Sequence, residues 1–168
     1  MNFSLAWKYS LLAALLMSIY GVMVCPFIDS LPNVTVVTVV FAGFLLQAGL
    51  LALLQKTWVE PQVFQERPRF QFRTDLLSYV VAGLGLGLFN FFYFGFPLES
   101  GLKLVVGALA IGFFAATDNA LFRERRELPQ RIQEQQDDTR EDKLFPITLK
   151  LSLFIGIIAL LTVAILIL

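Results

Sequence analysis

The chain has 168 residues, of which 57% are hydrophobic and only 15% are charged, and its formal net charge is zero. A composition this apolar lies outside the range of soluble domains and indicates an integral membrane protein. The chain has no histidine, and its single cysteine, Cys25, has no second thiol with which to form an internal disulfide. Haem sites with two histidine ligands and zinc-protease sites are therefore excluded, and we expect no cofactor and no metal.

Five apolar segments are long enough to cross a bilayer, because about 20 helical residues span a hydrocarbon core of about 30 Å. The first could instead be a signal peptide, but it is longer than a typical signal core and lacks a small-residue cleavage site before Cys25. We therefore expect an all-α membrane protein, in which residues 1–126 form a four-helix bundle arranged as two hairpins and a last helix runs outward. The predicted helices cover residues 7–28, 34–54, 75–96, 102–122 and 144–168.

Two hydrophilic connections separate these helices. Residues 55–74 contain Pro61 and Pro68, which prevent one continuous helix, and a mixture of basic and phenylalanine side chains. This composition fits either a segment lying on the membrane surface or an ordinary solvated loop. Nucleic acid is not an expected partner, because the basic segment is short and tethered at the bilayer. Residues 127–143 form a charged linker that cannot bury a core, so we expect a solvated helical extension or a flexible connection.

The basic residues give the expected orientation. Twelve of the 13 lysines and arginines lie on one side of the predicted helices, and only Lys103 lies on the other. The positive-inside rule then places the N-terminus and both long connections in the cytoplasm, with the protein in a bacterial inner membrane. We expect the basic residues to anchor this face to anionic lipid headgroups. These anchor residues are Lys56, Arg67, Arg69, Arg73, Arg123, Arg125 and Arg126.

Small residues mark two helix-packing seams. Gly83 and Gly87 have the GxxxG spacing that lets two helix backbones approach; a glycine-rich phosphate loop is the weaker interpretation, because no strand precedes them. The next helix carries a small residue at every fourth position. We expect these seams to pack against each other, against partner membrane helices or in a homo-oligomer. The second seam consists of Ala108, Gly112, Ala116 and Ala120.

Asp118 is the one acid that falls well inside a predicted span. Burying a charge in a bilayer costs several kcal/mol, so such an acid is a functional candidate. Because Arg123 follows about 7 Å further along the helix, Asp118 has two open interpretations: a capping or interfacial ion-pair role, or a role with protons, ions or signals. The neutral groups Asn119, Asn90 and Gln47 are expected to form hydrogen bonds between helices.

The C-terminal third of the chain resembles known membrane regions. Residues 112–126 (GFFAATDNALFRERR), the charged linker and residues 145–151 (FPITLKL) are similar to the segments that precede the outputs of bacterial receptor-type signalling proteins, namely adenylate or guanylate cyclases with a HAMP relay and sensor kinases. The resemblance implies that the last helix leads to an outer sensor segment, another span, HAMP and a catalytic domain. The apolar end at Leu168 is a further reason to expect that the chain continues.

No nucleophile, base and orienting group can be assembled from these residues. The first hypothesis is therefore a non-enzymatic membrane anchor or sensor module of a signal-transduction protein, with any cyclase or kinase activity in downstream domains. The second is a small transporter or channel subunit in which Asp118, Asn90 and Gln47 line a path. The third is a structural subunit of a membrane complex.

Overall fold

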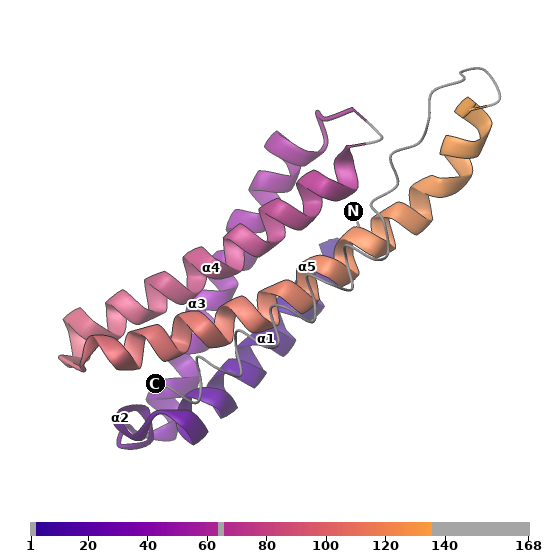
Figure 1. The fold of residues 1–168 in the computed structure, drawn as a ribbon. Coiled ribbons are helices and arrows are strands. Elements are labelled where there is room, and N and C mark those ends of the chain that lie inside the picture. Colours follow the sequence, from indigo (N-terminus) through magenta and orange to yellow (C-terminus); the bar gives the residue numbers. More distant parts are fainter. Residues whose placement is uncertain (1–2, 64–65, 136–168) are drawn as a thin grey trace.

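The computed structural model describes residues 3–63 and 66–135, and every regular element in these ranges is a helix. The predicted fifth helix, residues 144–168, lies outside the described residues. The expectation of an all-helical protein is confirmed for the described ranges. The elements are α1 (Phe3–Val24), α2 (Pro26–Asp29), α3 (Asn33–Leu54), the π-helical turn η1 (Gln55–Val59), α4 (Arg67–Phe94) and α5 (Leu98–Gln135) (Figure 1).

The four long helices form a bundle. Helices α4 and α5 pair as a long antiparallel hairpin, α1 packs against α3, and contacts of α3 with α4 and of α1 with α5 complete the ring (Figure 1). The end of α5 extends beyond the other helices. The core between the helices contains Ala13, Met17, Phe44, Tyr79, Leu104 and Ala108, all at most 5% exposed.

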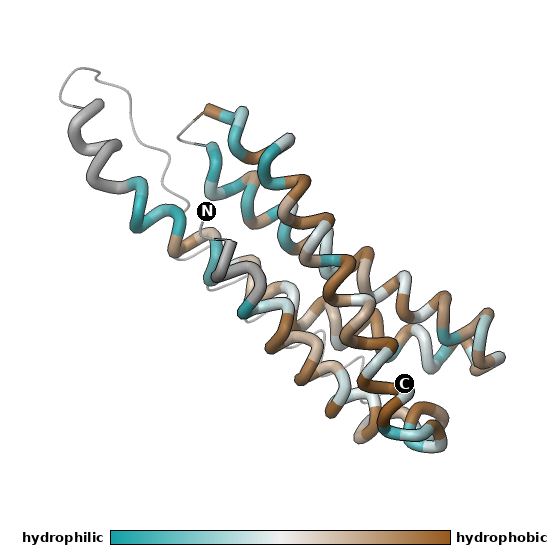
Figure 2. The backbone as a smooth tube through the Cα atoms, turned by 180° about the vertical axis from the view of Figure 1, so that it is seen from behind, coloured by the Kyte–Doolittle hydropathy of each residue, from teal (hydrophilic) through white to brown (hydrophobic). Residues whose placement is uncertain are grey.

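Three helical stretches are long and apolar enough to cross a membrane: Asn33–Val59, Arg67–Phe94 and Leu98–Glu127. The apolar stretch Lys8–Met23 in α1 is shorter. Figure 2 shows hydrophobic residues through the body of the bundle and hydrophilic ones around the start of α4, η1 and the far part of α5. The described residues thus contain three to four of the five predicted spans.

The predicted C-terminal end of the first helix is wrong. We predicted one helix over residues 7–28, but α1 ends at Val24 and the short helix α2 begins at Pro26. Proline has no N–H to continue the hydrogen-bond ladder and fits the first turn of a new helix, so the chain breaks at Cys25.

The predicted start of the third helix is also wrong. Helix α4 begins at Arg67 rather than at residue 75, and Pro68 lies in its first turn, where its missing N–H breaks no helical bond. Because α3 continues directly into η1, the connection predicted for residues 55–74 shrinks to residues 60–66. Helix α4 ends before Gly95, which has a φ of 67° that only glycine adopts without strain.

The fourth predicted helix is longer than expected at both ends. Helix α5 begins at Leu98, directly after Pro97, and continues to Gln135. For residues 127–135, the structure therefore favours the helical extension over the flexible linker.

Candidate functional site

A buried carboxyl group lies at the centre of the polar part of the bundle. Asp75, two turns into α4, has no solvent exposure. Its Oδ1 accepts a hydrogen bond from Gln71 Nε2 at 2.6 Å, and its Oδ2 accepts one from Asn119 Nδ2 on α5 at 2.9 Å. The amide of Gln55, in η1, lies beside the same carboxyl. We call Gln55, Gln71, Asp75 and Asn119 the Asp75 layer; none of the four is more than 4% exposed.

The Asp75 layer is incompletely satisfied by the described residues. Gln55 Nε2, Gln71 Oε1 and Asn119 Oδ1 are buried and have no hydrogen-bond partner there. An unpaired buried polar atom of this kind costs about 1–3 kcal/mol. The Asp75 carboxyl also has no ion pair with a described lysine or arginine. This buried polar cluster in a packed helix interface makes the Asp75 layer the candidate functional site.

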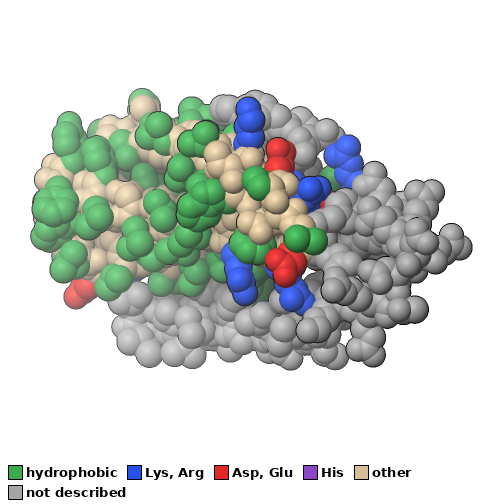
Figure 3. All heavy atoms as spheres, turned by 90° about the horizontal axis from the view of Figure 1, so that it is seen from above, with side chains coloured by type: hydrophobic (Ala, Val, Ile, Leu, Met, Phe, Trp, Pro, Cys, Tyr) green, Lys and Arg blue, Asp and Glu red, His purple; other side chains and the backbone are tan. Residues whose placement is uncertain are grey.

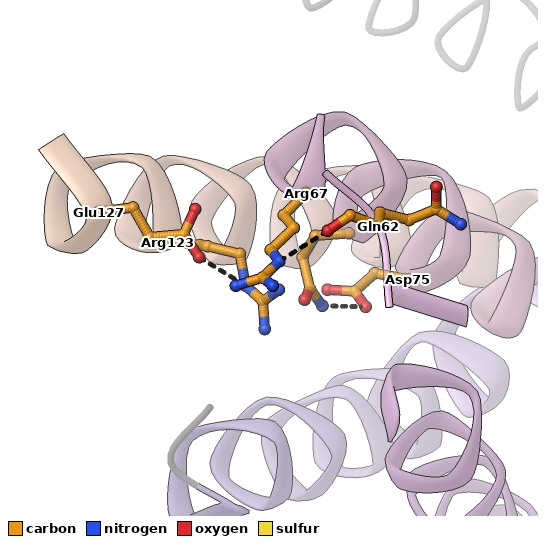
Figure 4. Close-up of polar contacts among 6 residues, drawn as sticks. Gln62, Arg67, Asp75, Arg123 and Glu127 are labelled. Carbon is orange, nitrogen blue, oxygen red and sulfur yellow. Dashed lines mark hydrogen bonds and ion pairs between the residues drawn. The ribbon is translucent and has the colours of Figure 1, made fainter. Parts of the chain in front are cut away.

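Charged residues border this layer at one end of the bundle. Arg123 Nε lies 4.0 Å from Glu127 Oε1, one turn further along α5. Arg123 also interacts electrostatically with Arg67, Glu60 and Asp75, and Arg67 Nε donates a hydrogen bond to the backbone oxygen of Gln62 at 3.0 Å (Figure 4). We call Glu60, Arg67, Arg123 and Glu127 the charged rim. It places two guanidinium groups and two carboxylates next to a buried acid.

A chain of hydrogen bonds connects Asp75 to the other two long helices. Ser10 Oγ on α1 donates to Gln47 Oε1 on α3 at 2.9 Å, and Gln47 Nε2 donates to Ser78 Oγ on α4 at 2.9 Å. Ser78 Oγ in turn donates to the backbone oxygen of Asp75 at 2.7 Å. All these side chains are buried, and together they join α1, α3 and α4 beside the Asp75 layer.

A separate polar contact fixes the opposite end of the α4–α5 hairpin. Asn90 Nδ2 donates to Ser100 Oγ at 2.7 Å, and Ser100 Oγ lies 3.0 Å from Cys25 Sγ. These three buried residues come from α4, α5 and the break between α1 and α2. They hold this end of the bundle together, where the α4–α5 turn and the α1–α2 break lie.

The predicted intramembrane polar residues lie in different parts of the bundle. Asp118 is exposed and accepts a hydrogen bond from the Tyr9 hydroxyl on α1. Asn119 belongs to the Asp75 layer, Gln47 to the Ser10–Ser78 chain and Asn90 to the opposite end. The structure therefore does not bring Asp118, Asn90 and Gln47 together along one path.

The central acid was not predicted from the sequence. The third helix was expected to start at residue 75, which placed Asp75 at a helix end, and Gln55 and Gln71 were expected in a hydrophilic connection. The signal that could have identified the layer is Gln71 and Asp75, spaced one turn apart on a helix that Pro68 starts.

The predicted seams lie inside the protomer. A Cβ atom on Gly83 would lie 2.6 Å from Ala108 Cβ, and one on Gly87 would lie 3.0 Å from the Gly101 backbone oxygen. A Cβ on Gly112 would lie 2.4 Å from Tyr79 Cβ. Ala116 is fully buried and Ala120 is partly buried. The hairpin thus depends on small residues for the close approach of α4 and α5.

The predicted basic anchor residues gather towards one end of the molecule. Figure 3 shows charged side chains there, next to a long hydrophobic surface. Among them, Arg67, Arg69 and Arg123 are partly buried, and the exposed members are Lys56, Arg73, Arg125 and Arg126.

The sequence of this apolar helical bundle matches the model of a known family. The MASE10 family model matches residues 9–168. The chain belongs to the MASE10 family. MASE10 is a membrane-associated sensory domain, so the predicted membrane region of a signalling protein is confirmed at that level.

One curated relative of this MASE10 domain is a cyclic di-GMP phosphodiesterase from Vibrio cholerae serotype O1, which is 31% identical over 125 residues. The match covers 74% of this chain and 24% of the relative, so the chain spans about a quarter of that protein's length. No solved structure matches the chain. The relative supports neither the adenylate or guanylate cyclase nor the sensor kinase that the sequence resemblance implied.

Proposed function

We propose that this MASE10 domain is a non-enzymatic membrane sensor that controls the turnover of cyclic di-GMP by a catalytic domain of the same protein. Family membership supports the sensory role, and the phosphodiesterase relative supports this second messenger. The observation that carries the proposal is the Asp75 layer. There η1, α4 and α5 share one polar site inside an apolar bundle, and three of its buried polar atoms have no hydrogen-bond partner among the described residues.

The signal leaves the site along α5. Asn119 bonds directly to Asp75, and α5 continues without interruption from Asn119 to Gln135. These 17 residues rise about 24 Å along the helix, and Pro129 within them removes one backbone hydrogen bond, which favours a bend at that point. A ligand or modification that changes the hydrogen bonding of Asp75 favours one arrangement of α4 against α5, and the helix carries the displacement away from the bundle.

The charged end of the bundle is the cytoplasmic end in this proposal. The positive-inside rule supports that orientation, because the basic residues cluster around the charged rim (Figure 3). The exposed members then contact anionic headgroups of a bacterial inner membrane. Self-association would have to use other surfaces than the two seams, since Gly83 and Gly112 already pack against α5 and α4 within one protomer.

The test uses the protein that carries this domain, with its own catalytic domain, in bacteria that hold a fluorescent reporter of cyclic di-GMP. We expect Asp75→Asn to change the reporter level several-fold. Asp118→Asn is the matched control, because Asp118 is an exposed acid next to Asn119 on the same helix, and it should leave the reporter unchanged. If Asp75→Asn leaves the reporter at the wild-type level while the protein stays in the membrane in normal amount, the proposal is wrong.

A further inference from the structure

The Asp75 carboxyl is buried without a compensating positive group in direct contact. Its two hydrogen bonds come from neutral amides. The charged groups around it are Arg123 and Glu127 on α5, Arg67 on α4 and Glu60 after η1, and Arg123 pairs with Glu127 rather than with Asp75. Tyr79, one turn along α4, also faces it. A carboxylate in such surroundings is strongly stabilised by any small cation that reaches it.

We propose that the Asp75 layer is a binding site for one monovalent cation, either a sodium ion or a proton. The site itself stands on the geometry described above. The idea that this cation is the signal read by the sensor rests on the proposed function.

The groups that can supply oxygen ligands to a cation are in contact with one another. The two carboxylate oxygens of Asp75 touch the amides of Gln71 and Asn119, and both amide oxygens lack a partner among the described residues. The nitrogen and oxygen of an amide exchange places when the group turns by half a rotation. Turning both amides brings their oxygens next to the two carboxylate oxygens, and oxygen ligands are those that a sodium ion prefers.

The charge balance favours a monovalent ion. One carboxylate in a ring of neutral amides neutralises one positive charge. The described residues contain no group of three acidic, histidine or cysteine side chains that would suit a divalent metal. A proton meets the same requirement, because a protonated Asp75 becomes a donor and one turned amide then accepts its hydrogen bond.

Cation binding would act directly on the α4–α5 interface. In the structure the amide nitrogens of Gln71 and Asn119 face Asp75, whereas a bound cation requires at least one amide oxygen to face it. Because Asn119 belongs to α5 and Gln71 to α4, the two states differ in the bond that joins these helices. This provides two discrete arrangements for one site.

The test measures thermal unfolding of the purified chain in detergent micelles, followed by the fluorescence of Trp7 and Trp58. Sodium chloride is titrated against choline chloride at constant ionic strength, at several pH values, for wild type, Asp75→Asn and Asp118→Asn. A saturable rise of Tm with sodium that Asp75→Asn abolishes and Asp118→Asn retains supports a sodium site. A rise of Tm with acid, without a sodium effect and again dependent on Asp75, supports a proton site. If wild type and Asp75→Asn respond alike to both ions, the inference is wrong.

A second variant covers the case in which Asp75→Asn fails to fold. Asn119→Leu keeps the carboxyl and removes one amide. We expect it to weaken sodium affinity about tenfold or more, because the ion loses an oxygen ligand, and to strengthen proton binding, because the carboxylate loses a hydrogen-bond donor. Infrared difference spectra provide an independent readout: acid or sodium should change the carboxyl bands of wild type. If Asn119→Leu binds the cation with wild-type affinity and the carboxyl bands stay constant, the site does not exist. Cation binding by purified protein whose reporter output ignores Asp75 would refute the proposed function and leave this site intact.

Discussion

The tightest contact between α4 and α5 provides a sharp test of the structure. In Gly112→Ala, the new Cβ would lie 2.4 Å from Tyr79 Cβ and 2.7 Å from Tyr79 Cγ. These atoms are attached close to the α4 backbone and cannot swing aside, so the two helices must separate by about 1 Å to restore ordinary contact.

The expected cost has three parts. Overpacking destabilises the folded state by about 1–3 kcal/mol. The higher helix propensity of alanine than of glycine stabilises it by about 1 kcal/mol. The same separation lengthens the bond from Asn119 to Asp75, now 2.9 Å, to about 4 Å, which is beyond hydrogen-bond range. Losing a bond to a buried carboxyl adds about 1.5–3 kcal/mol. We therefore expect Gly112→Ala to lower the free energy of unfolding by about 1.5–5 kcal/mol.

The assay is unfolding of the purified chain in mixed micelles with increasing denaturing detergent, followed by circular dichroism. Gly85→Ala is the matched control, because a Cβ on Gly85 has no atom within 4 Å. It should be neutral or stabilising by up to about 1 kcal/mol. If Gly112→Ala is as stable as Gly85→Ala, the packing of Tyr79 against α5 described here is wrong.

Three further predictions use the same principles. Gly83→Ala should destabilise by about 1–3 kcal/mol, and Ala108→Gly in the same chain should restore most of the loss, because the two Cβ atoms would lie 2.6 Å apart; additive losses in the detergent titration would contradict this pairing. Ser100→Ala leaves the buried Asn90 amide without its acceptor and should cost about 1–3 kcal/mol in that titration, whereas a loss below about 0.5 kcal/mol would show that the bond is not needed. Replacing the exposed basic residues by glutamine should weaken contact with anionic lipid in nanodiscs, at about 1 kcal/mol per residue, with zwitterionic lipid as the control; unchanged quenching by brominated anionic lipid would count against the anchor. The residues to replace are Lys56, Arg73, Arg125 and Arg126.

The helical membrane class could be predicted from the sequence because it depends on local properties. Apolar length, turn residues and helix propensity act within a few neighbouring residues, so the helices at residues 34–54 and 102–122 differ from α3 and α5 mainly at their ends. The errors occur at Pro26 and Pro68, where proline can either end one helix or begin the next. Only the surrounding structure decides between these two effects.

The candidate site was predictable in part. Asn119 was singled out as a polar group inside a span, but its partner Asp75 was placed at a helix end, where a carboxylate is normally solvated. An acid at a helix start is buried only when another helix packs over it. The hydrophobic periodicity of one segment does not show which other segment packs against it. Asp118, for which an interfacial and a functional role were both left open, is exposed, because one residue along a helix turns the side chain by about 100° from the buried Asn119.

Composition and the spacing of small residues are enough to identify an apolar helical chain whose helices can pack closely. Which polar groups share the interior depends on the tertiary structure. Helix length and composition are properties of single segments, whereas the meeting of Gln55, Gln71, Asp75 and Asn119 depends on the rotation and depth of three elements relative to one another. The cost of burying their unpaired atoms arises only once that arrangement exists.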